Sequence, residues 1–372
     1  MKKINSKNTY LVGGAVRDIL LGENPKDKDY VVIGLNPSDM IEMGFSQVGK
    51  DFPVFLHPET GFEYALARKE IKNGFGYNGF SVDTKGVSLE DDLFRRDLTI
   101  NAMAMDELGN LIDPFNGKED LQNKILKHVS EHFKEDPVRI LRTARFSARY
   151  DFSVHEETIS LMQSIVSNGE FNHLTSERVW KEFEKVLTEK KVYNFFKVLK
   201  KSNALEKLSG FSNNINLDYL EHLESHNIHN INKKLIACFK HMNEKDLNLW
   251  KMPTEEKTYI LNFKQFSKNN NFYSNMNVEE KLFFINKTKS IHDLNKNKEL
   301  INNIIDYLSW KEKKVYDFES EFNLLTEDVC KIKSLDYQNI INQAKELGEK
   351  PQVLIIQNQK NAILPKKGLK LK

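Results

Sequence analysis

The sequence predicts an α+β protein in which a small domain with a mixed sheet comes first and a long all-helical part follows. Short β-like runs, such as Tyr30 to Ile33 and Glu63 to Ala67, alternate with glycine and proline up to about Leu126. Most of the 17 glycines fall in that part of the chain. After Leu126 apolar residues recur at spacings of three and four, as in amphipathic helices. We therefore expect three domains, which cover residues 1–126, 127–210 and 211–372.

The segment from Tyr10 to Gly34 predicts a strand, a glycine pair that opens a short helix, and a second strand. The pair Gly13-Gly14 allows a tight turn close to a ligand, and the helix behind it offers free N–H groups to phosphate. Asp27 and Asp29 lie two residues apart on a strand-like run, so their carboxylates point the same way and can hold a divalent metal. This segment predicts a site for a metal-bound nucleotide.

Two further blocks follow in the predicted sheet domain. Glu63 lies in FEYALARKE, a strand-like run that could lie beside the aspartate strand and supply a third carboxylate. A solvated or salt-bridged glutamate is an equally good interpretation, because Arg68 is an ordinary ion-pair partner. In the block that begins at Asp91, adjacent arginines precede Asp97. Guanidinium groups such as that of Arg96 match phosphate oxygens, and a carboxylate accepts from a ribose hydroxyl.

The segment from Val138 to Tyr150 predicts a helix that begins behind Asp136, an N-cap residue followed by Pro137 at the first helical position. One stripe of this helix is apolar, and the stripe beside it is basic: Val138, Leu141, Ala144 and Ala148 against Arg139, Arg142, Arg145 and Arg149. Arginines at the edge of a buried face can simply extend from the core into solvent. Arginines behind an acidic cap also suit an anion or a nucleobase, and both interpretations stay open here.

Composition places few limits on function. The 55 basic and 53 acidic residues nearly balance, so the net charge does not indicate a nucleic-acid binder. Two cysteines far apart in sequence and no recognisable leader predict a reducing, cytoplasmic location, and we expect Cys238 to be a small buried residue. No apolar run approaches the roughly eighteen residues of a membrane helix, so no membrane is expected as a partner.

Several ordered blocks resemble the class II tRNA nucleotidyltransferase and bacterial poly(A) polymerase superfamily. They are GGAVRD with a downstream DxD, RRDLTINAMA, DPFNGKEDLQNKILKHV and EDPVRILRTARFSARYDF. Two more blocks, VGKDFPVFLHPETGFEYALAR and HLTSERVWKEFEKVL, resemble the CCA-adding enzymes of gamma-proteobacterial type. The resemblance covers about residues 8–210. It implies a polymerase beta-like nucleotidyltransferase head, followed by a helical neck, body and tail.

The resemblance also implies roles for individual residues. Asp27 and Asp29 would hold two Mg²⁺ ions, with Glu63 as a third catalytic carboxylate, while Gly14 and Arg17 would contact the triphosphate. Arg96 would bind nucleotide phosphate and Asp97 would lie near the ribose. Asp136 and Arg139 would serve as a protein template for the incoming base, and Arg142 and Arg145 would complete the nucleotide pocket.

The activity that the resemblance implies is template-independent addition and repair of the 3′-terminal CCA of tRNA from CTP and ATP. The acceptor would be RNA and not DNA. A poly(A) polymerase and a CC-only or A-only enzyme share the same blocks and remain alternatives. The resemblance also links the loop from Phe75 to Phe80, expected to be mobile, to the switch from adding C to adding A.

The last domain departs from relatives that carry an HD-type metal phosphohydrolase. At the aligned place the segment from Phe239 to Asn243 lacks the acid of the His-Asp pair, and His292-Asp293 restores the doublet out of register. Three histidines with helical spacing have no evident carboxylate partner: His222, His226 and His229. We expect a helical domain without the hydrolase site; a bifunctional phosphohydrolase is the less favoured alternative.

Overall fold

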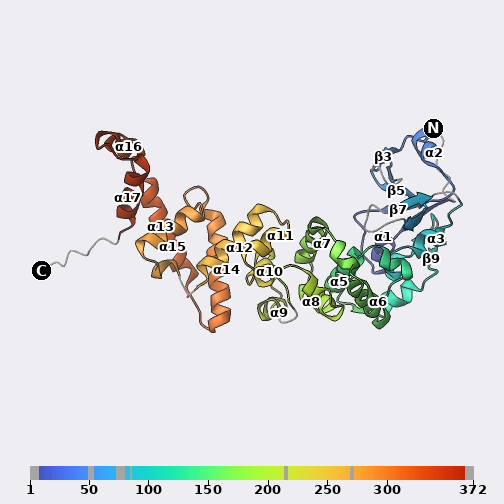
Figure 1. Ribbon diagram of the computed structural model, residues 1–372. Helices are drawn as coiled ribbons and strands as arrows, with labels where there is room; N and C mark the ends of the chain where they lie inside the picture. The colour runs from blue at the N-terminus through green and yellow to red at the C-terminus, as the bar shows by residue number, and fades with distance from the viewer. Residues whose placement is uncertain are drawn as a thin grey trace. The chain divides into compact units, whose positions relative to one another are not determined.

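The computed structural model describes residues 8–48, 54–72, 80–83, 86–212, 217–268 and 272–364 (Figure 1). The chain forms two compact units, of which the first comprises Met1–Ile215 with Leu249–Lys251 and the second comprises Asn216–Asn248 with Met252–Lys372. The predicted loop from Phe75 to Phe80 lies outside the described residues except for Phe80, the first residue of a strand.

The first unit contains the mixed sheet that the sequence predicts, so the α+β class is confirmed. The sheet has seven strands in the order β3-β4-β5-β2-β1-β8-β9. Their bounds are β1 Thr9–Val12, β2 Asp29–Val32, β3 Ser46–Val48, β4 Val54–Leu56, β5 Glu63–Leu66, β8 Ala104–Met105 and β9 Leu111–Ile112. β2 and β5 run parallel, with Asp29 paired to Glu63, and the other neighbours run antiparallel. Glu63 therefore lies beside the aspartate strand, as predicted.

Two smaller pairings complete the strands. β6 Lys69–Lys72 and β7 Phe80–Asp83 form an antiparallel pair, and β10 Ile125–Leu126 pairs in parallel with β11 Ser153–Val154. The short helices of this part are α1 Gly14–Leu20, α2 Pro37–Glu42, α3 Leu89–Phe94 and α4 Gly117–Gln122.

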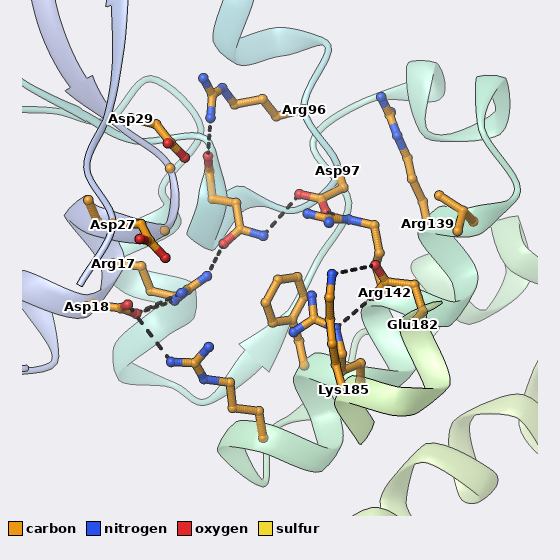
Figure 2. A pocket seen from close by; sticks show the side chains of 18 of the residues that line it. Arg17, Asp18, Asp27, Asp29, Arg96, Asp97, Arg139, Arg142, Glu182 and Lys185 are labelled. Atoms are coloured by element: carbon orange, nitrogen blue, oxygen red, sulfur yellow. Dashed lines mark hydrogen bonds and ion pairs between the residues drawn. The ribbon is translucent and has the colours of Figure 1, made fainter. Parts of the chain in front are cut away.

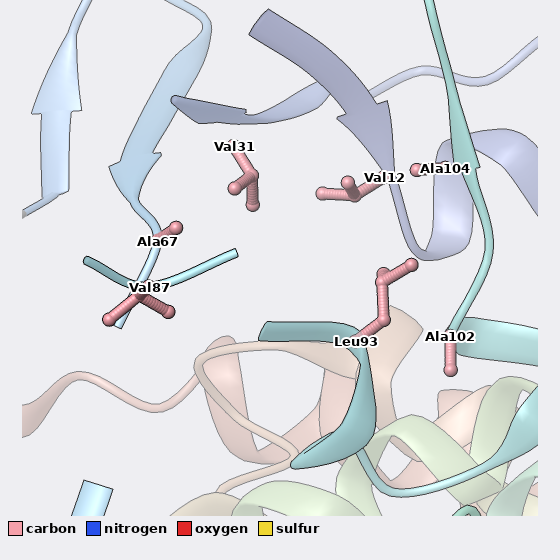
Figure 3. Close-up of a cluster of buried hydrophobic side chains, with 7 residues drawn as sticks. All are labelled: Val12, Val31, Ala67, Val87, Leu93, Ala102 and Ala104. Atoms are coloured by element: carbon pink, nitrogen blue, oxygen red, sulfur yellow. The ribbon is translucent and has the colours of Figure 1, made fainter. Parts of the chain in front are cut away.

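Hydrophobic side chains cover both faces of the sheet. Successive strand residues point to opposite faces, and Val31 and Val32 accordingly enter two different buried clusters. The first cluster joins the sheet to α3 and comprises Val12, Val31, Ala67, Val87, Leu93, Ala102 and Ala104 (Figure 3). The second comprises Val32, Met40, Phe45, Phe55 and Leu66. These two layers hold β1 and β2 in place, and thereby the turn and the aspartates at their ends.

Helices form the rest of the first unit. They are α5 Val138–Tyr150, α6 Glu156–Ser167, α7 Ser176–Thr188 and α8 Val192–Lys201, each at a segment with predicted helical periodicity. α5 packs against α7 and α8. The predicted apolar stripe of α5 is buried throughout, and Phe183 of α7 packs against Phe195 and Trp250 with ring centroids 5.5 and 5.3 Å apart. This core fixes how α5 and α7 face each other.

The described part of the second unit is helical. Its helices are α9 Asp218–Ser225, α10 Ile231–Phe239, α11 Glu244–Leu249, α12 Thr254–Phe266, α13 Val278–Lys287, α14 Leu294–Glu312, α15 Phe318–Lys333, α16 Tyr337–Glu346 and α17 Pro351–Ile363. Cys238 is fully buried, as predicted. His292 lies in the turn after α13, where its N–H donates to Lys289 O. Within the described ranges, no three His, Cys, Asp or Glu side chains gather as a metal site, and no helix has the length and apolarity to cross a membrane.

Candidate active site

One large cavity of about 1060 Å³ lies in the first unit, between the sheet and helices α5 and α7 (Figure 2). Its wall is built from the turn at Gly13, helix α1, the segment before β2, the loop after α3, and one face each of α5 and α7. Every predicted site residue except Glu63 lines it: Gly14, Arg17, Asp27, Asp29, Arg96, Asp97, Asp136, Arg139, Arg142 and Arg145. Folding thus brings residues from three predicted blocks to one place.

The glycine turn forms the bottom of the wall next to Arg96. Gly13 has a φ of +69°, a conformation that side chains rarely allow. A Cβ atom there would lie 2.8 Å from Nη1 of Arg96, and the Gly13 N–H donates to Met103 O at 3.1 Å. The backbone conformation therefore favours glycine at this position, and a larger residue would also displace the end of the Arg96 side chain.

The two aspartates face the same space, as Figure 2 shows. Asp29 is an exposed residue, but partial desolvation in the wall of the cavity raises the pKa of its carboxyl. The charge of Arg96 opposes this rise in pKa, and the charge of Asp27 adds to it. A bound cation would relieve both the desolvation and the repulsion. Carboxylate oxygens are also the donors that Mg²⁺ prefers, so these residues fit a divalent metal.

Glu63 takes a different position. Its backbone pairs with that of Asp29, yet its side chain is exposed and does not line the cavity. Among the residues that the structure describes, no three acidic side chains are close enough to hold a metal together. A part for Glu63 in catalysis stays a prediction.

A chain of buried hydrogen bonds crosses the floor of the cavity from α1 to α5. Arg17 Nη1 donates to Asn101 Oδ1 at 2.5 Å, and Asn101 Nδ2 donates to Asp97 Oδ1 at 3.0 Å. Arg142 Nε donates to the other oxygen of Asp97 at 2.8 Å. Burial works against the charged carboxylate of Asp97, but Arg142, the Asn101 amide and Arg139 hold its pKa well below the ordinary value. Asp97 is therefore a fixed anion that orients Arg142.

Arg17 is held on its other side by Asp18. Its Nε and Nη2 donate to Asp18 Oδ1 at 3.0 and 2.7 Å, and the guanidinium lies over the rings of Phe146 and Tyr150. The Tyr150 hydroxyl also donates to Asp18 Oδ1, at 3.2 Å, and burial raises its pKa to about 12. The predicted phosphate ligand Arg17 thus stands in a preformed setting of α1 and α5.

Asp92 anchors the arginine pair after α3. Its fully buried carboxylate accepts from Arg95 Nη2 at 2.6 Å and from Arg96 Nη2 at 3.1 Å. Desolvation would raise the pKa of Asp92, but the two guanidinium groups lower it below the ordinary value. The sequence block singled out the arginines and did not identify Asp92 as the residue that positions them.

Asp136 and Arg139 both line the cavity, but each is held by other residues and not by the other member of the pair. Asp136 Oδ1 accepts from the Val138 N–H at 3.1 Å, and its Oδ2 accepts from Arg178 Nη2 at 2.7 Å. Arg139 Nη1 and Nη2 donate to the backbone oxygens of His132 and Arg95, at 2.9 and 2.8 Å. α5 itself begins at Val138, one residue later than predicted, and its N-cap is Pro137 rather than the predicted Asp136. Asp136 still accepts a hydrogen bond from the first N–H of the helix.

Arg145 is more deeply buried than contact with a ligand in the cavity would require. Its side chain is only 8% exposed, and its Nε donates to Glu182 Oε2 of α7 at 2.8 Å. Burial alone would raise the pKa of Glu182, but Arg145, then Lys185, lowers it. This buried pair joins α5 to α7. Lys185 Nζ donates to Glu182 Oε1 at 3.3 Å and lies nearer the rim of the cavity.

The sequence analysis missed the contribution of α7. Arg178, Lys181, Glu182 and Lys185 all line the cavity. Their spacings of three and four residues place them on one face of a helix, and they lie in the HLTSERVWKEFEKVL block. That spacing was a usable signal for a second charged face turned toward α5.

A mixed sheet with a carboxylate pair next to a glycine turn, closed by arginine-bearing helices, is the layout of a nucleotidyltransferase head joined to a helical domain. Residues 9–127 match the family model of the poly A polymerase head domain. Residues 151–211 match the model described as the probable RNA and SrmB-binding site of polymerase A. These two ranges, a little under half of the chain, are similar to domains of poly(A) polymerases, in line with the predicted relationship. Helix α5 lies between the two matched ranges.

Curated relatives agree with the family models. A CCA-adding enzyme of Marinobacter nauticus is 61% identical over 204 residues, which are 54% of this chain and 55% of that protein. A multifunctional CCA protein of Acinetobacter baylyi is 58% identical over 203 residues, 54% of this chain and 49% of that protein. The chain thus spans about half the length of these relatives.

Solved structures share the fold over nearly the whole chain. The Bacillus stearothermophilus CCA-adding enzyme in complex with CTP has a TM-score of 0.66 at 21% identity, covering 95% of this chain and 88% of that one. A CCA-adding enzyme with ATP has a TM-score of 0.62 at 22% identity, covering 97% and 91%. The predicted arrangement of a sheet-containing head followed by helices is confirmed.

Proposed function

We propose that this protein adds and repairs the 3′-terminal CCA of tRNA, using CTP and ATP without a nucleic-acid template. The observation that carries the proposal is that one cavity holds both the carboxylate pair Asp27 and Asp29 and the acceptor and donor pair Asp136 and Arg139. The first pair suits nucleotidyl transfer and the second suits selection of a base. The relatives named as CCA-adding enzymes support this reading over a poly(A) polymerase.

At the reacting end, Asp27 and Asp29 would hold Mg²⁺, which when bound activates the primer 3′-hydroxyl and stabilises the pyrophosphate leaving group. Gly14, through its backbone, and Arg17 and Arg96, through their guanidinium groups, would position the triphosphate for in-line attack. Arg17 and Arg96 are pre-oriented by hydrogen bonds to Asn101, so little reorganisation is needed on binding. Pyrophosphate leaves as the new phosphodiester bond forms.

At the other end, Asp136 and Arg139 would read the base. C and A both present an amino group beside an unprotonated ring nitrogen, which match a carboxylate acceptor and a guanidinium donor. G and U present a carbonyl beside an N–H and would leave both protein groups unpaired, which disfavours them strongly. Asp97 would lie near the ribose and hold Arg142, and Arg145 would support the same wall through α7.

We assign residues 1–126 to the catalytic head, 127–210 to a base-selecting and RNA-binding neck, and 211–372 to a helical body and tail without hydrolase function. Phosphates of tRNA would meet lysines and arginines of the helical parts, with shape read more than sequence. The acceptor is RNA rather than DNA, and the reaction belongs to the cytoplasm. These assignments extend the similarity of the matched half to the whole chain.

The test is incorporation of labelled CTP and ATP, singly and together, into tRNA transcripts that end before CCA, after C, or after CC. We expect exact completion to CCA, with a DNA hairpin of the same acceptor sequence as an unreactive control. Asp29→Asn should abolish incorporation and leave the fold intact. Long A tails from ATP alone, or stopping after CC with both nucleotides present, would overturn the CCA assignment.

Glu63 requires its own comparison within that assay. We expect Glu63→Gln to slow incorporation by about tenfold to a hundredfold, the range for residues that support metal ligands from outside. Asp29→Asn should cost much more. An equal loss for both variants would make Glu63 a direct ligand.

A further inference from the structure

The carboxylate that would read the base is held by a different helix. Arg178 of α7 donates from Nη2 to Asp136 Oδ2 at 2.7 Å across 42 positions of sequence, and their side chains are 29% and 22% exposed. The other oxygen of Asp136 accepts from the Val138 N–H at 3.1 Å. Each oxygen therefore accepts a hydrogen bond from a protein donor.

We infer that Arg178 is a positioning residue for base selection, because it sets the rotation of the Asp136 carboxylate and so determines which lone pairs face the incoming base. This inference rests on the proposed function. A carboxylate offers about four acceptor sites, so two protein donors leave acceptor capacity for an amino group. Arg178 acts on the base only through Asp136.

The physical argument concerns one torsion angle. The terminal torsion of an aspartate is broad and roughly two-fold, so a single hydrogen bond to one oxygen leaves the carboxylate plane free to turn. The Val138 N–H alone would allow such turning. A guanidinium donor on Oδ2 fixes the plane, and because Arg has a rigid fork it does so more strictly than an ammonium group.

The donor half of the base-reading pair has partners outside α7. Arg139 donates to the backbone oxygens of His132 and Arg95, which lie in the segments before α5 and after α3. Loss of Arg178 would therefore disturb recognition of the amino group and spare the orientation of Arg139. The predicted defect is a loss of discrimination between amino bases and keto bases, rather than a general loss of nucleotide binding.

The position of Arg178 is itself rigid. Four residues further along α7, Glu182 makes the buried contact with Arg145 of α5 at 2.8 Å. Residues four apart share one face of a helix, so this pair fixes α7 against α5 one turn away from Arg178. The geometry that orients Asp136 is thus a property of the packed helices.

The experiment compares wild type, Arg178→Ala, Arg178→Lys and Lys118→Ala, an exposed cation of α4 in the head and outside the cavity, as the matched control. For each, kcat and KM are measured for CTP and for UTP on tRNA lacking CCA, together with KM for the tRNA. We expect Arg178→Ala to lower the CTP over UTP ratio of kcat/KM by about tenfold, with KM for tRNA unchanged. Arg178→Lys should recover only part of the ratio, and Lys118→Ala should match wild type.

A double-mutant cycle separates positioning from any other part played by Arg178. In an Asp136→Ala background, Arg178→Ala should cause no further change of the ratio, because its target is gone. The ratio is internal to each preparation, so a variant that is only partly folded still gives a valid reading. An additive effect in the double variant, an unchanged ratio in Arg178→Ala, or a change in KM for tRNA alone would each overturn the inference.

Failure of the proposed function would give a different experimental result from failure of the inference about Arg178. Wild type that adds neither C nor A to tRNA would overturn the activity itself. Calorimetric binding of CTP and UTP to the same variants then decides the inference separately, since selection by Asp136 and Arg178 predicts the same loss of preference in binding.

Discussion

Arg142 of α5 donates from Nε to Asp97 Oδ2 at 2.8 Å, across 45 positions of sequence. Asp97 belongs to the loop after α3, so this contact joins the sheet-bearing part of the first unit to its helices. The same carboxylate accepts from Asn101, which in turn accepts from Arg17. The side of the cavity proposed to bind phosphate and the side proposed to read the base are therefore connected through Asp97.

Replacing Asp97 with asparagine tests this coupling. Arg142 would lose its carboxylate partner while its side chain is 35% exposed, so we expect a cost of about 1–3 kcal/mol of unfolding free energy. We expect Asp97→Asn to lose stability in urea denaturation and to raise KM for CTP and ATP. Glu107→Gln, at an exposed acid of the same domain, should behave as wild type. Unchanged stability of Asp97→Asn would mean that Arg142 finds other partners.

The pH dependence of stability follows from the same group of carboxylates. Asp92, Asp97 and Glu182 have pKa values below their ordinary ones in the folded protein. Groups of this kind stabilise the fold above their unfolded pKa and lose that contribution as the pH falls through the folded value. We therefore expect the melting temperature to drop as the pH falls below about 4.5.

The matched variants for this prediction lie on one helix. Glu182→Gln should flatten the acid slope of the melting temperature, because one lowered pKa is removed. Glu184→Gln, an exposed neighbour on α7, should leave the slope as it is. Equal slopes for both variants would show that the contact between Glu182 and Arg145 does not contribute to acid sensitivity.

Removing one of the two aspartates should raise the melting temperature without metal and prevent its rise when metal is added. In chelator, Asp27→Asn should melt at a higher temperature than wild type, since repulsion from Asp27 is one cause of the raised pKa of Asp29. Adding Mg²⁺ should raise the melting temperature of wild type and not that of the variant. Incorporation by the variant should fall by a hundredfold or more, the upper end expected when metal binding is disturbed. A full Mg²⁺ shift in Asp27→Asn would place the metal elsewhere.

Gly13 and Gly22 separate the effect of backbone strain from an effect on the site. Both have positive φ values, +69° and +78°, which alanine rarely adopts, so alanine at either position should be destabilising. Only at Gly13 would the new Cβ meet Arg96, at 2.8 Å, whereas Gly22 has nothing within 4 Å. We expect Gly13→Ala alone to raise KM for nucleotides, measured beside melting temperatures of both variants. Equal effects on KM would rule out a special role for the contact with Arg96.

Local patterns in the sequence predicted much of this fold. Alternation of side chains identified the strands around Asp29 and Glu63, and the parallel pairing confirms that they are neighbours. The start signal Asp136-Pro137 and the three-and-four spacing predicted the beginning of α5 to within one residue, although the N-cap is Pro137 and not Asp136. Both signals are local, because period and capping depend on residues within a few positions of each other.

Such local patterns could not identify contacts between residues that lie far apart in the sequence. The sequence placed Asp136 and Arg139 at the start of a predicted helix, but it could not reveal that Arg178 and two backbone oxygens hold them. Pairings of this kind depend on how helices pack, and packing is decided by the whole core. Glu63 shows the converse, since correct strand pairing still left its side chain outside the cavity.

Helix α5, a segment of 13 residues, lies between the ranges that match the two family models. The matched ranges therefore leave out the segment that carries Arg139, Arg142 and Arg145. The proposed function predicts that exchanging residues 136–150 between relatives of different nucleotide preference transfers that preference and leaves both matched ranges unchanged. The proposed base selection would then depend on a segment separate from both ranges, although Arg178, which contacts Asp136, lies in the second.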